Sequence, residues 1–374
     1  MSKKRDRGEG SIYQTKDGTW RGAVTLPDGR RKYFRGDTRR EVADKIAKAL
    51  VDLQNGVLLP PDKQTFGQFL TRWLEDVAKP SVRPATYTSY EQLARVHILP
   101  DSIAKRPLSK LTPQDVQAFL NRKQQGDISA RTVQYLHAVI RRALEIALRW
   151  GFVVRNVAKL VEPPRVKRQE VKPLSPEQAK TFLEAAKEDR LYAMYVVALA
   201  LGLRQGELFG LKWEDVDFDT GTLRIVRALQ RIDGKPQFVE PKSDKSRRVI
   251  ALPRFVVDTL REHKVRQLEE RLLVGSRWQD WGLVFSTSVG TPLENSNTLK
   301  AFKALLRRAG LPDMRFHDLR HSAASLLLAQ GLSPRVIMEV LGHSQIGLTM
   351  NTYAHVLPAL QREAAEAMDK LLGQ

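Results

Sequence analysis

The sequence contains no cysteine, no long apolar run and few aromatic residues. Because none of the 374 residues is a cysteine, a disulfide framework, a thiolate metal site and a cysteine nucleophile are excluded. No stretch approaches the roughly 18 consecutive apolar residues of a membrane span, and the N-terminal segment lacks the apolar core of a signal peptide. Hydrophobic residues make up 42% and charged residues 28%, which is a globular composition. We expect a soluble, cytoplasmic protein with no membrane partner.

Acidic residues are scarce relative to basic ones, with 62 Lys and Arg against 42 Asp and Glu and a formal net charge of +20. The excess is uneven: residues 1–60 carry a net charge of +6, residues 61–168 carry +10, and the remaining residues carry only +4. Such an excess is typical of proteins that bind an extended polyanion, of which nucleic acid is the commonest. The first two segments are therefore expected to contact DNA, unless the charge only keeps the surface soluble.

The N-terminal residues predict a small β-rich module. Residues 10–35 contain short runs of alternating apolar residues separated by two Asp-Gly pairs, which favour hairpin turns. A stretch with helical spacing follows. We place a ββ-β-α module at residues 1–56 and a linker at 57–64, within a chain long enough for two or three domains. Its sheet could lie in a major groove, and the candidate DNA contacts are Arg21, Arg30, Arg31, Lys32 and Arg35.

Residues 65–160 predict a compact domain of four helices. Apolar residues recur at helical spacing in four stretches, and Thr112-Pro113 opens the third with an N-cap and a first-turn proline. The fourth stretch directs arginines outward, and the linker expected at residues 161–172 is also basic. The candidate DNA contacts of this part are Arg131, Arg141, Arg142, Arg165, Lys167 and Arg168.

Residues 173–357 predict a mixed α+β domain that is mostly helical. Its helical spacing is interrupted at residues 222–252, where β-rich runs alternate with turn residues. The three strands expected there are 222–226, 237–239 and 248–252. Residues 358–374 have the apolar stripe of a C-terminal helix. The expected fold class is therefore multidomain, mainly α with small β elements.

Four segments of this last domain place a cationic or proton-transferring residue beside a turn or a helix end. They contain Arg204 with Glu207, Lys242, His317 with Arg320, and His343, and Tyr353 follows ten residues after His343. In this set and order the sequence resembles the tyrosine recombinase (phage integrase) family over about residues 173–357. The four-helix segment resembles the core-binding domain of that family, and residues 10–55 resemble the arm-site DNA-binding domain of some integrases.

The resemblance implies an enzyme that cuts and rejoins DNA at specific sites, integrating or excising a mobile element or phage. Tyr353 would form a 3′-phosphotyrosyl intermediate, and strands would exchange through a Holliday junction. Guanidinium groups match the charged oxygens of the transition state. Arg204 and Arg320 would supply these groups, with Glu207 holding Arg204.

The remaining site residues would move protons or bind the phosphate. Lys242, with Lys245 as the competing candidate, would protonate the departing 5′-oxygen. His317 would deprotonate or orient Tyr353, and His343 would donate a hydrogen bond to the phosphate. Because the cations are side chains, we expect no metal ion or other cofactor.

Each of these residues also has a structural explanation. Arg204 can simply pair with Glu207, Lys242 can be a solvated hairpin charge, and a tyrosine taken alone is more often a core residue. Two other functions remain open, a DNA-binding scaffold that retains the fold and a relaxing topoisomerase that acts as a monomer. The expected partners are double-stranded DNA at core-type and arm-type sites, three further copies in a tetramer, and an accessory directionality or bending factor. The C-terminal helix would pack on its own domain or on a neighbouring protomer.

Overall fold

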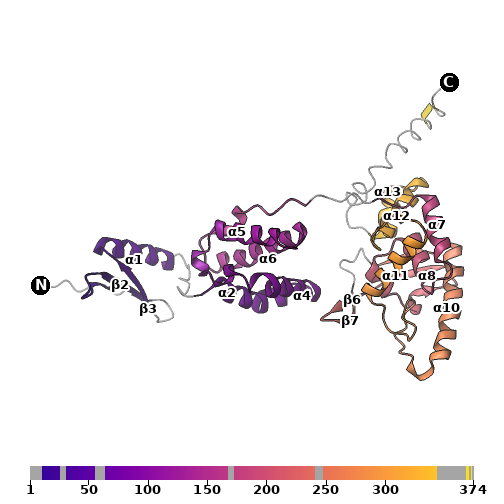
Figure 1. Cartoon of the computed structure of the whole chain (residues 1–374), viewed down its shortest axis with the longest axis horizontal. Coiled ribbons are helices and arrows are strands. Elements are labelled where there is room, and N and C mark those ends of the chain that lie inside the picture. The colour runs from indigo at the N-terminus through magenta and orange to yellow at the C-terminus, as the bar shows by residue number, and fades with distance from the viewer. Residues whose placement is uncertain are drawn as a thin grey trace. The chain divides into compact units, whose positions relative to one another are not determined.

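The computed structural model of the chain describes residues 11–25, 31–54, 64–166, 172–240 and 247–342, together with residues 368, 369 and 372. Its contacts divide the chain into two compact units, residues 1–167 and 168–374. Helices predominate in both units, with small antiparallel sheets (Figure 1). None of the described helices is long and apolar enough to cross a membrane. The expected fold class, multidomain and mainly α with small β elements, is confirmed.

The first unit begins with an antiparallel sheet of order β1-β2-β3 and a helix along one face of it (Figure 1). The elements are β1 (Ser11–Gln14), β2 (Trp20–Thr25), β3 (Arg31–Gly36) and α1 (Arg39–Gln54). The turn after β1 contains Gly18 at φ +81°, which glycine adopts without strain. Val24 packs against Val42 and Ile46 of α1. Gly22 admits the helix because a Cβ there would lie 2.5 Å from Ile46 Cδ1.

The rest of the first unit is a helical bundle, and the N-cap that the sequence predicts at Thr112 is present. Its helices are α2 (Phe66–Trp73), α3 (Lys79–Ser81), α4 (Pro84–Leu93), α5 (Pro113–Gln125) and α6 (Ala130–Arg149). The side chains of Thr65, Thr112 and Ser129 each accept a backbone N–H of the first helical turn. π-helical turns extend α2 over Leu74–Ala78 and α4 over Ala94–Ile98, which the apolar spacing does not indicate.

The second unit is built around a helix that is apolar on every side. Its helices are α7 (Pro176–Ala186), α8 (Tyr192–Leu201), α9 (Gln205–Phe209), α10 (Arg254–Val274), α11 (Asn295–Arg308), α12 (Asp318–Ala329) and α13 (Pro334–Leu341). The central helix α8 contacts α7, α10 and α12. The rings of Phe182, Tyr195 and Phe302 meet between α7, α8 and α11, with centroids 5.5 to 6.3 Å apart. Since α12 also contacts α13, helix ends distant in sequence come together.

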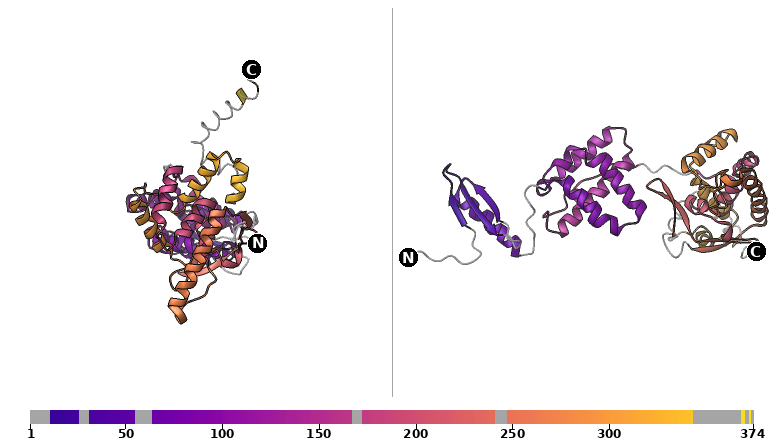
Figure 2. Two further views of the ribbon diagram at one scale, coloured as in Figure 1. Left: turned by 90° about the vertical axis from the view of Figure 1, so that its right-hand side faces the viewer. Right: turned by 90° about the horizontal axis from the view of Figure 1, so that it is seen from below.

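Residues 222–252 contain four described strands where the sequence predicts three. The strands of this unit are β4 (Val216–Asp217), β5 (Thr222–Ile225), β6 (Ala228–Ile232), β7 (Lys235–Val239) and β8 (Arg248–Ala251). β5 pairs with β4 and β8, whereas β6 and β7 form a separate hairpin (Figure 2). The hairpin turn has Asp233 at φ +51° and Gly234 at +75°, as an Asp-Gly turn favours. The sequence misses β6 because Gln230 and Arg231 interrupt its apolar residues.

Candidate functional site

Gly202 marks the point where the C-terminal end of α8 meets α12 and α13. It ends α8 in the left-handed region at φ +59°, and a Cβ on it would lie 2.4 Å from Leu341 Cδ2 of α13. The same Cβ would lie 3.1 Å from the Cβ of Ala323 in α12. Glycine is therefore required both by the turn and by the close approach of the two helices. The turn places Arg204 directly before α9.

Arg204 is held by a carboxylate and by a backbone carbonyl. Its Nη1 donates to Glu207 Oε1 at 2.7 Å, and its Nη2 donates to the Gly342 carbonyl at 2.6 Å. Glu207 Oε2 also accepts the backbone N–H of Arg204 at 3.2 Å, so the same carboxylate caps α9. The Glu207 side chain is 4% exposed and that of Arg204 is 37% exposed. The carboxylate is thus buried under a guanidinium that still reaches solvent.

Arg320 and His317 lie at the start of α12. Arg320 is 3% exposed, and its Nη1 donates to the Gly202 carbonyl at 2.7 Å, which ties α12 to the turn before Arg204. His317 retains solvent exposure, and its ring lies 5.5 Å from that of His321 in an edge-on contact. Partial burial, followed by the neighbouring His321 and Arg320, lowers the pKa of His317 to about 4, although solvent screens part of this effect. At neutral pH the ring is therefore uncharged and able to accept a proton.

We expect the His317 ring of the free protein to titrate far below the ordinary histidine pKa of 6.5, with a midpoint near 4. NMR titration of the ring protons measures this, and a His317→Gln variant assigns the resonance. Because the folded pKa lies below the unfolded value, the unfolded state binds this proton more readily, and the free energy of unfolding falls as the pH drops from 6.5 toward 4. The variant should lose that part of the pH dependence, and a midpoint near 6.5 would contradict the placement of the ring.

An arginine to which the sequence assigns no role, Arg248, contacts the same carboxylate. Its side chain is 8% exposed, its Nη2 donates to Glu207 Oε2 at 3.1 Å, and its Nε donates to the Val340 carbonyl at 2.8 Å. Arg248 begins β8, where Val249 is exposed and Ile250 is buried, so strand alternation points Arg248 inward. That alternation is a signal in the sequence, but it cannot identify a carboxylate 41 residues away. We call Arg204, Glu207, Arg248 and Arg320 the arginine cluster.

Three predicted site residues lie outside the part of the chain that the structure describes. They are Lys242, His343 and Tyr353. On either side of Lys242, the side chains of Glu240 and Arg247 form an ion pair at 2.9 Å between the ends of β7 and β8. The structure thus brings Arg204, Glu207 and Arg320 together around the Gly202 turn, with His317 at the start of α12, and the roles of all the site residues stay predictions.

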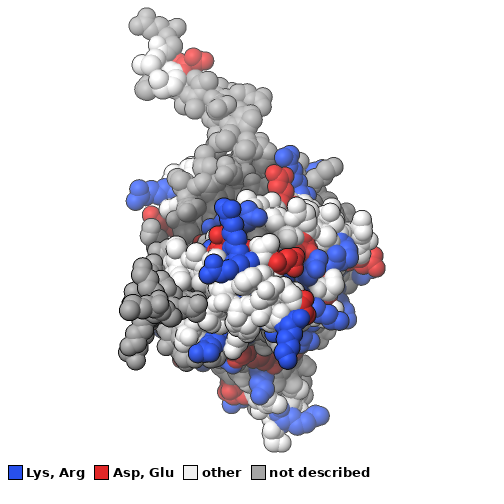
Figure 3. All heavy atoms as spheres, turned by 90° about the vertical axis from the view of Figure 1, so that its left-hand side faces the viewer, with Lys and Arg blue, Asp and Glu red and all other residues white. Residues whose placement is uncertain are grey.

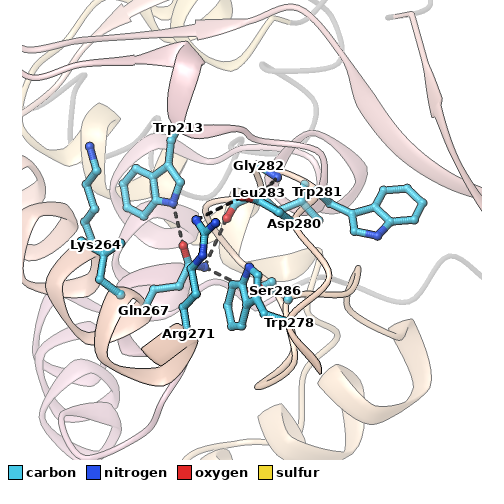
Figure 4. Close-up of a pocket in the computed structure, with 12 residues that line it drawn as sticks. Trp213, Lys264, Gln267, Arg271, Trp278, Asp280, Trp281, Gly282, Leu283 and Ser286 are labelled. Atoms are coloured by element: carbon cyan, nitrogen blue, oxygen red, sulfur yellow. Dashed lines mark hydrogen bonds and ion pairs between the residues drawn. The ribbon is translucent and has the colours of Figure 1, made fainter. Parts of the chain in front are cut away.

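A pocket in this unit is separate from the arginine cluster. It lies between α10 and the segment that follows it, and is lined by three tryptophans (Figure 4). Trp213 Nε1 donates to Gln267 Oε1 at 2.7 Å, and Arg271 pairs with Asp280 at 3.1 Å. No member of the arginine cluster lines this pocket. Across the described residues, no group of three or more His, Cys, Asp or Glu is arranged to hold a metal ion.

The N-terminal sheet carries basic side chains on both of its faces. Arg21 and Arg31 are exposed on the face opposite α1, where the neighbouring Tyr13 and Tyr33 are also exposed. Lys32 instead stands across from Val24, which packs against α1, so it lies on the helix side of the sheet. Of the candidate DNA contacts described in this sheet, Lys32 thus lies on the other face from Arg21, Arg31 and Arg35. The exposed tyrosine and arginine side chains form what we call the open face, namely Tyr13, Arg21, Arg31, Tyr33 and Arg35.

The predicted contacts of the helical bundle are solvent-accessible where they are described. Arg131, Arg141 and Arg142 are exposed along α6, and Arg165 is exposed beyond it. Arg142 also donates to the Tyr90 hydroxyl at 3.1 Å. Lys and Arg side chains are spread over the face drawn in Figure 3, with Asp and Glu between them. Three further candidates lie outside the described residues: Arg30, Lys167 and Arg168.

Family models and curated relatives match this chain along most of its length. The phage integrase family model matches residues 172–359, and the model of the N-terminal SAM-like domain of phage integrases matches residues 65–124. A tyrosine recombinase XerC-like protein of Caldanaerobacter subterraneus subsp. tengcongensis is 33% identical over 91% of this chain and 92% of its own length. An integrase of Streptomyces ambofaciens is 31% identical over 99% of this chain and 98% of its own.

Solved structures share the fold. The Tn1549 transposon integrase in complex with transposon right end DNA superposes with a TM-score of 0.68 at 22% identity, covering 83% of this chain and 100% of that one. A lambda integrase tetramer bound to a Holliday junction gives a TM-score of 0.58 at 18% identity, covering 94% of this chain and 96% of that one. At these identities the likeness establishes the architecture.

Proposed function

The chain belongs to the phage integrase family, and from this premise we propose that Arg204 and Arg320 of its arginine cluster bind the DNA phosphate at which strands are cut and rejoined. As a tyrosine-type site-specific recombinase, the protein breaks and rejoins DNA in the integration or excision of a mobile element. One observation supports the assignment of residues most directly. Arg204 and Arg320, far apart in sequence, are both bound to carbonyl groups where α8, α12 and α13 meet.

The proposed chemistry exchanges one phosphoester bond for another. The phenol oxygen of Tyr353 attacks the phosphorus, the bond from phosphorus to the 5′-oxygen breaks, and the DNA stays joined to the protein through a 3′-phosphotyrosyl bond. Negative charge grows on the non-bridging oxygens, which the forks of Arg204 and Arg320 match. A 5′-hydroxyl later attacks the phosphotyrosine and reverses the step, so no bond energy is lost.

Proton transfer in this scheme falls to residues around the cluster. His317, uncharged at neutral pH, takes the phenol proton or orients Tyr353. Lys242, with Lys245 as the alternative, gives a proton to the departing 5′-oxygen, and His343 donates a hydrogen bond to the phosphate. The low pKa of His317 supports its part, since a ring that is already protonated could not act as a base.

For the assembly, we propose a tetramer of this chain on two double-stranded DNA sites. A lambda integrase tetramer bound to a Holliday junction has the same fold over 94% of this chain. The helical bundle and the second unit would hold the core-type site, and the N-terminal sheet would bind an arm-type site. An accessory factor would set the direction of recombination.

A nicked attachment-site duplex tests the activity. The site is found by sequencing the DNA that flanks the gene and identifying a repeated segment there. The nick is placed close to the cleavage point, so that the cleaved fragment diffuses away and the adduct accumulates. Denaturing electrophoresis should then reveal a covalent protein–DNA complex. Binding without an adduct would indicate a DNA-binding scaffold, and relaxation of plasmids that lack the site would indicate a topoisomerase.

The open face of the N-terminal sheet is proposed to contact the arm-type site. Changing Arg21 and Arg31 together to Ala should weaken binding of an arm-site duplex about ten-fold or more, and the loss of two phosphate contacts should lower the salt slope by about two. Fluorescence anisotropy at several salt concentrations measures both quantities. The matched control changes Arg39 and Lys48, which are exposed on α1. Equal losses in the two double variants would show that charge alone matters, and the open face would then have no special role.

A further inference from the structure

Arg248 connects three elements of the second unit. It lies at the first position of β8, binds Glu207 of α9 and donates to the Val340 carbonyl at the end of α13. The guanidinium also lies against the backbone that follows α13, since a Cβ on Gly342 would lie 2.8 Å from Arg248 Nη1. The side chain of Arg248 is 8% exposed, so its guanidinium is buried among these three elements.

The carboxylate of Glu207 is divided between two guanidinium groups. Oε1 accepts from Arg204 Nη1 at 2.7 Å, and Oε2 accepts from Arg248 Nη2 at 3.1 Å. An isolated arginine and carboxylate prefer two parallel hydrogen bonds, which would use two N–H groups of the arginine fork. Arg204 gives Glu207 a single side-chain hydrogen bond and uses its other terminal nitrogen for the Gly342 carbonyl, while Oε2 accepts from Arg248 and from the backbone N–H of Arg204.

We propose that Arg248 is a positioning residue: by binding Glu207 Oε2 it prevents Arg204 from closing onto Glu207 as a two-bond pair, and so keeps the Arg204 fork turned toward the DNA phosphate. The inference rests on the proposed function of the arginine cluster. Among the described residues Arg248 contacts Glu207 and the backbone at the end of α13, and its proposed effect on the phosphate passes through Glu207 to Arg204.

The pKa of Glu207 indicates that Arg248 contributes strongly to stabilising its charged carboxylate. Burial raises the pKa of Glu207, and the charge of Arg248 opposes this more strongly than that of Arg204, so that the net pKa is lowered. Removing Arg248 leaves a buried carboxylate with one cationic partner. A carboxylate in that position draws its remaining partner closer, because an uncompensated buried charge is costly. The partner drawn inward is Arg204, the group that the phosphate needs.

Single-turnover cleavage of the nicked attachment-site duplex tests the proposal. Arg248→Gln should lower the first-order rate constant of adduct formation about ten-fold or more, as expected when one phosphate donor is misdirected. The dissociation constant for the duplex should stay within about three-fold of the wild-type value, because other Lys and Arg side chains supply most of the binding. Arg248→Lys, which keeps a cation for Oε2, should recover part of the rate.

Arg227→Gln is the matched control. Arg227 pairs with the buried Asp215 and with Glu214 in the same unit, and no contact joins it to the arginine cluster among the described residues. A purely structural loss would reduce the fraction of protein that reacts in both variants and leave the rate constant unchanged. The positioning role predicts a lower rate constant for Arg248→Gln alone. If Arg248→Gln does not fold, the rate constant of Arg248→Lys is measured instead, and a value below that of the wild-type protein supports the positioning role.

A double variant isolates the route through Glu207. In a Glu207→Gln background no carboxylate competes for Arg204, so adding Arg248→Gln should change the rate constant less than about three-fold, the coupling expected of residues that act through one another. Full additivity, or a wild-type rate for Arg248→Gln, would overturn the inference. If the wild-type protein forms no adduct at all, the proposed function fails instead, and the two failures are thereby distinguished.

Discussion

The Tyr353→Phe variant is expected to bind attachment-site DNA with the affinity of the wild-type protein and to form no covalent adduct. The change removes one oxygen atom, the atom proposed to attack the phosphorus, and leaves the ring in place. No other group can then carry the 3′-phosphate, so the loss should be complete within the detection limit. Electrophoretic mobility shifts measure binding, and denaturing gels of the nicked duplex measure the adduct.

Tyr195→Phe provides the control for this substitution. Tyr195 is 0% exposed, and its hydroxyl has no hydrogen-bond partner among the described residues. Burial, with Asp189 adding to it, raises the pKa of this phenol well above its usual range, so it cannot serve as a nucleophile. Its removal should leave adduct formation unchanged. An adduct that persists in Tyr353→Phe would mean that another side chain attacks the DNA, and the assignment of the nucleophile would be wrong.

The second large effect is expected from Arg320→Ala, which should slow adduct formation by about 10²–10³-fold, as the loss of one transition-state donor does elsewhere. The substitution also leaves the buried Gly202 carbonyl without the Nη1 donor at 2.7 Å. Because an unsatisfied buried carbonyl typically costs about 1–3 kcal/mol, some loss of stability should accompany the kinetic effect. Rate constants and urea unfolding curves, measured on the same preparation, separate the two.

Arg308→Ala is a control of the same chemical kind. The guanidinium of Arg308 also donates to a backbone carbonyl at a helix end, that of Ala185 at 2.6 Å, but it lies on α11 and outside the arginine cluster. Its loss should leave the cleavage rate within about two-fold, as for most substitutions away from a site. A similar slowing in the two variants would remove Arg320 from the proposed phosphate site.

Much of the fold follows from local patterns in the sequence. The cap at Thr112 and the turn at Asp233-Gly234 depend only on neighbouring residues, and the structure places them as expected. The pairing of β5 with β8 is different. It joins strands that are separated in sequence by the whole β6–β7 hairpin. The residue pattern within a strand does not indicate which other strand it pairs with. The same limit applies to Lys32, whose face of the sheet is set by α1 packing on one side.

The contacts of the site likewise include some that local sequence predicts and some that it does not. Arg204 and Glu207 are three residues apart, so their contact follows from the geometry of one helical turn. The bond from Arg320 to the Gly202 carbonyl spans 118 residues and could be expected only from the family resemblance. Arg248 was missed because a second arginine after Arg247 resembles a solvated hairpin charge in sequence. The roles of Lys242, His343 and Tyr353 remain predictions, and the Tyr353→Phe variant tests the last of them.

Gly202 has no functional side chain, yet a substitution there is expected to disturb the site. One added methyl group would require the Leu341 side chain to move, since the two atoms would otherwise lie 2.4 Å apart, and would also strain a backbone at φ +59°. The two guanidinium groups proposed to bind the phosphate, those of Arg204 and Arg320, are both anchored within this junction, so a single misplaced carbon would disturb them together. Engineers who diversify this recombinase to retarget it would do well to hold codon 202 fixed, even though that residue carries no functional group.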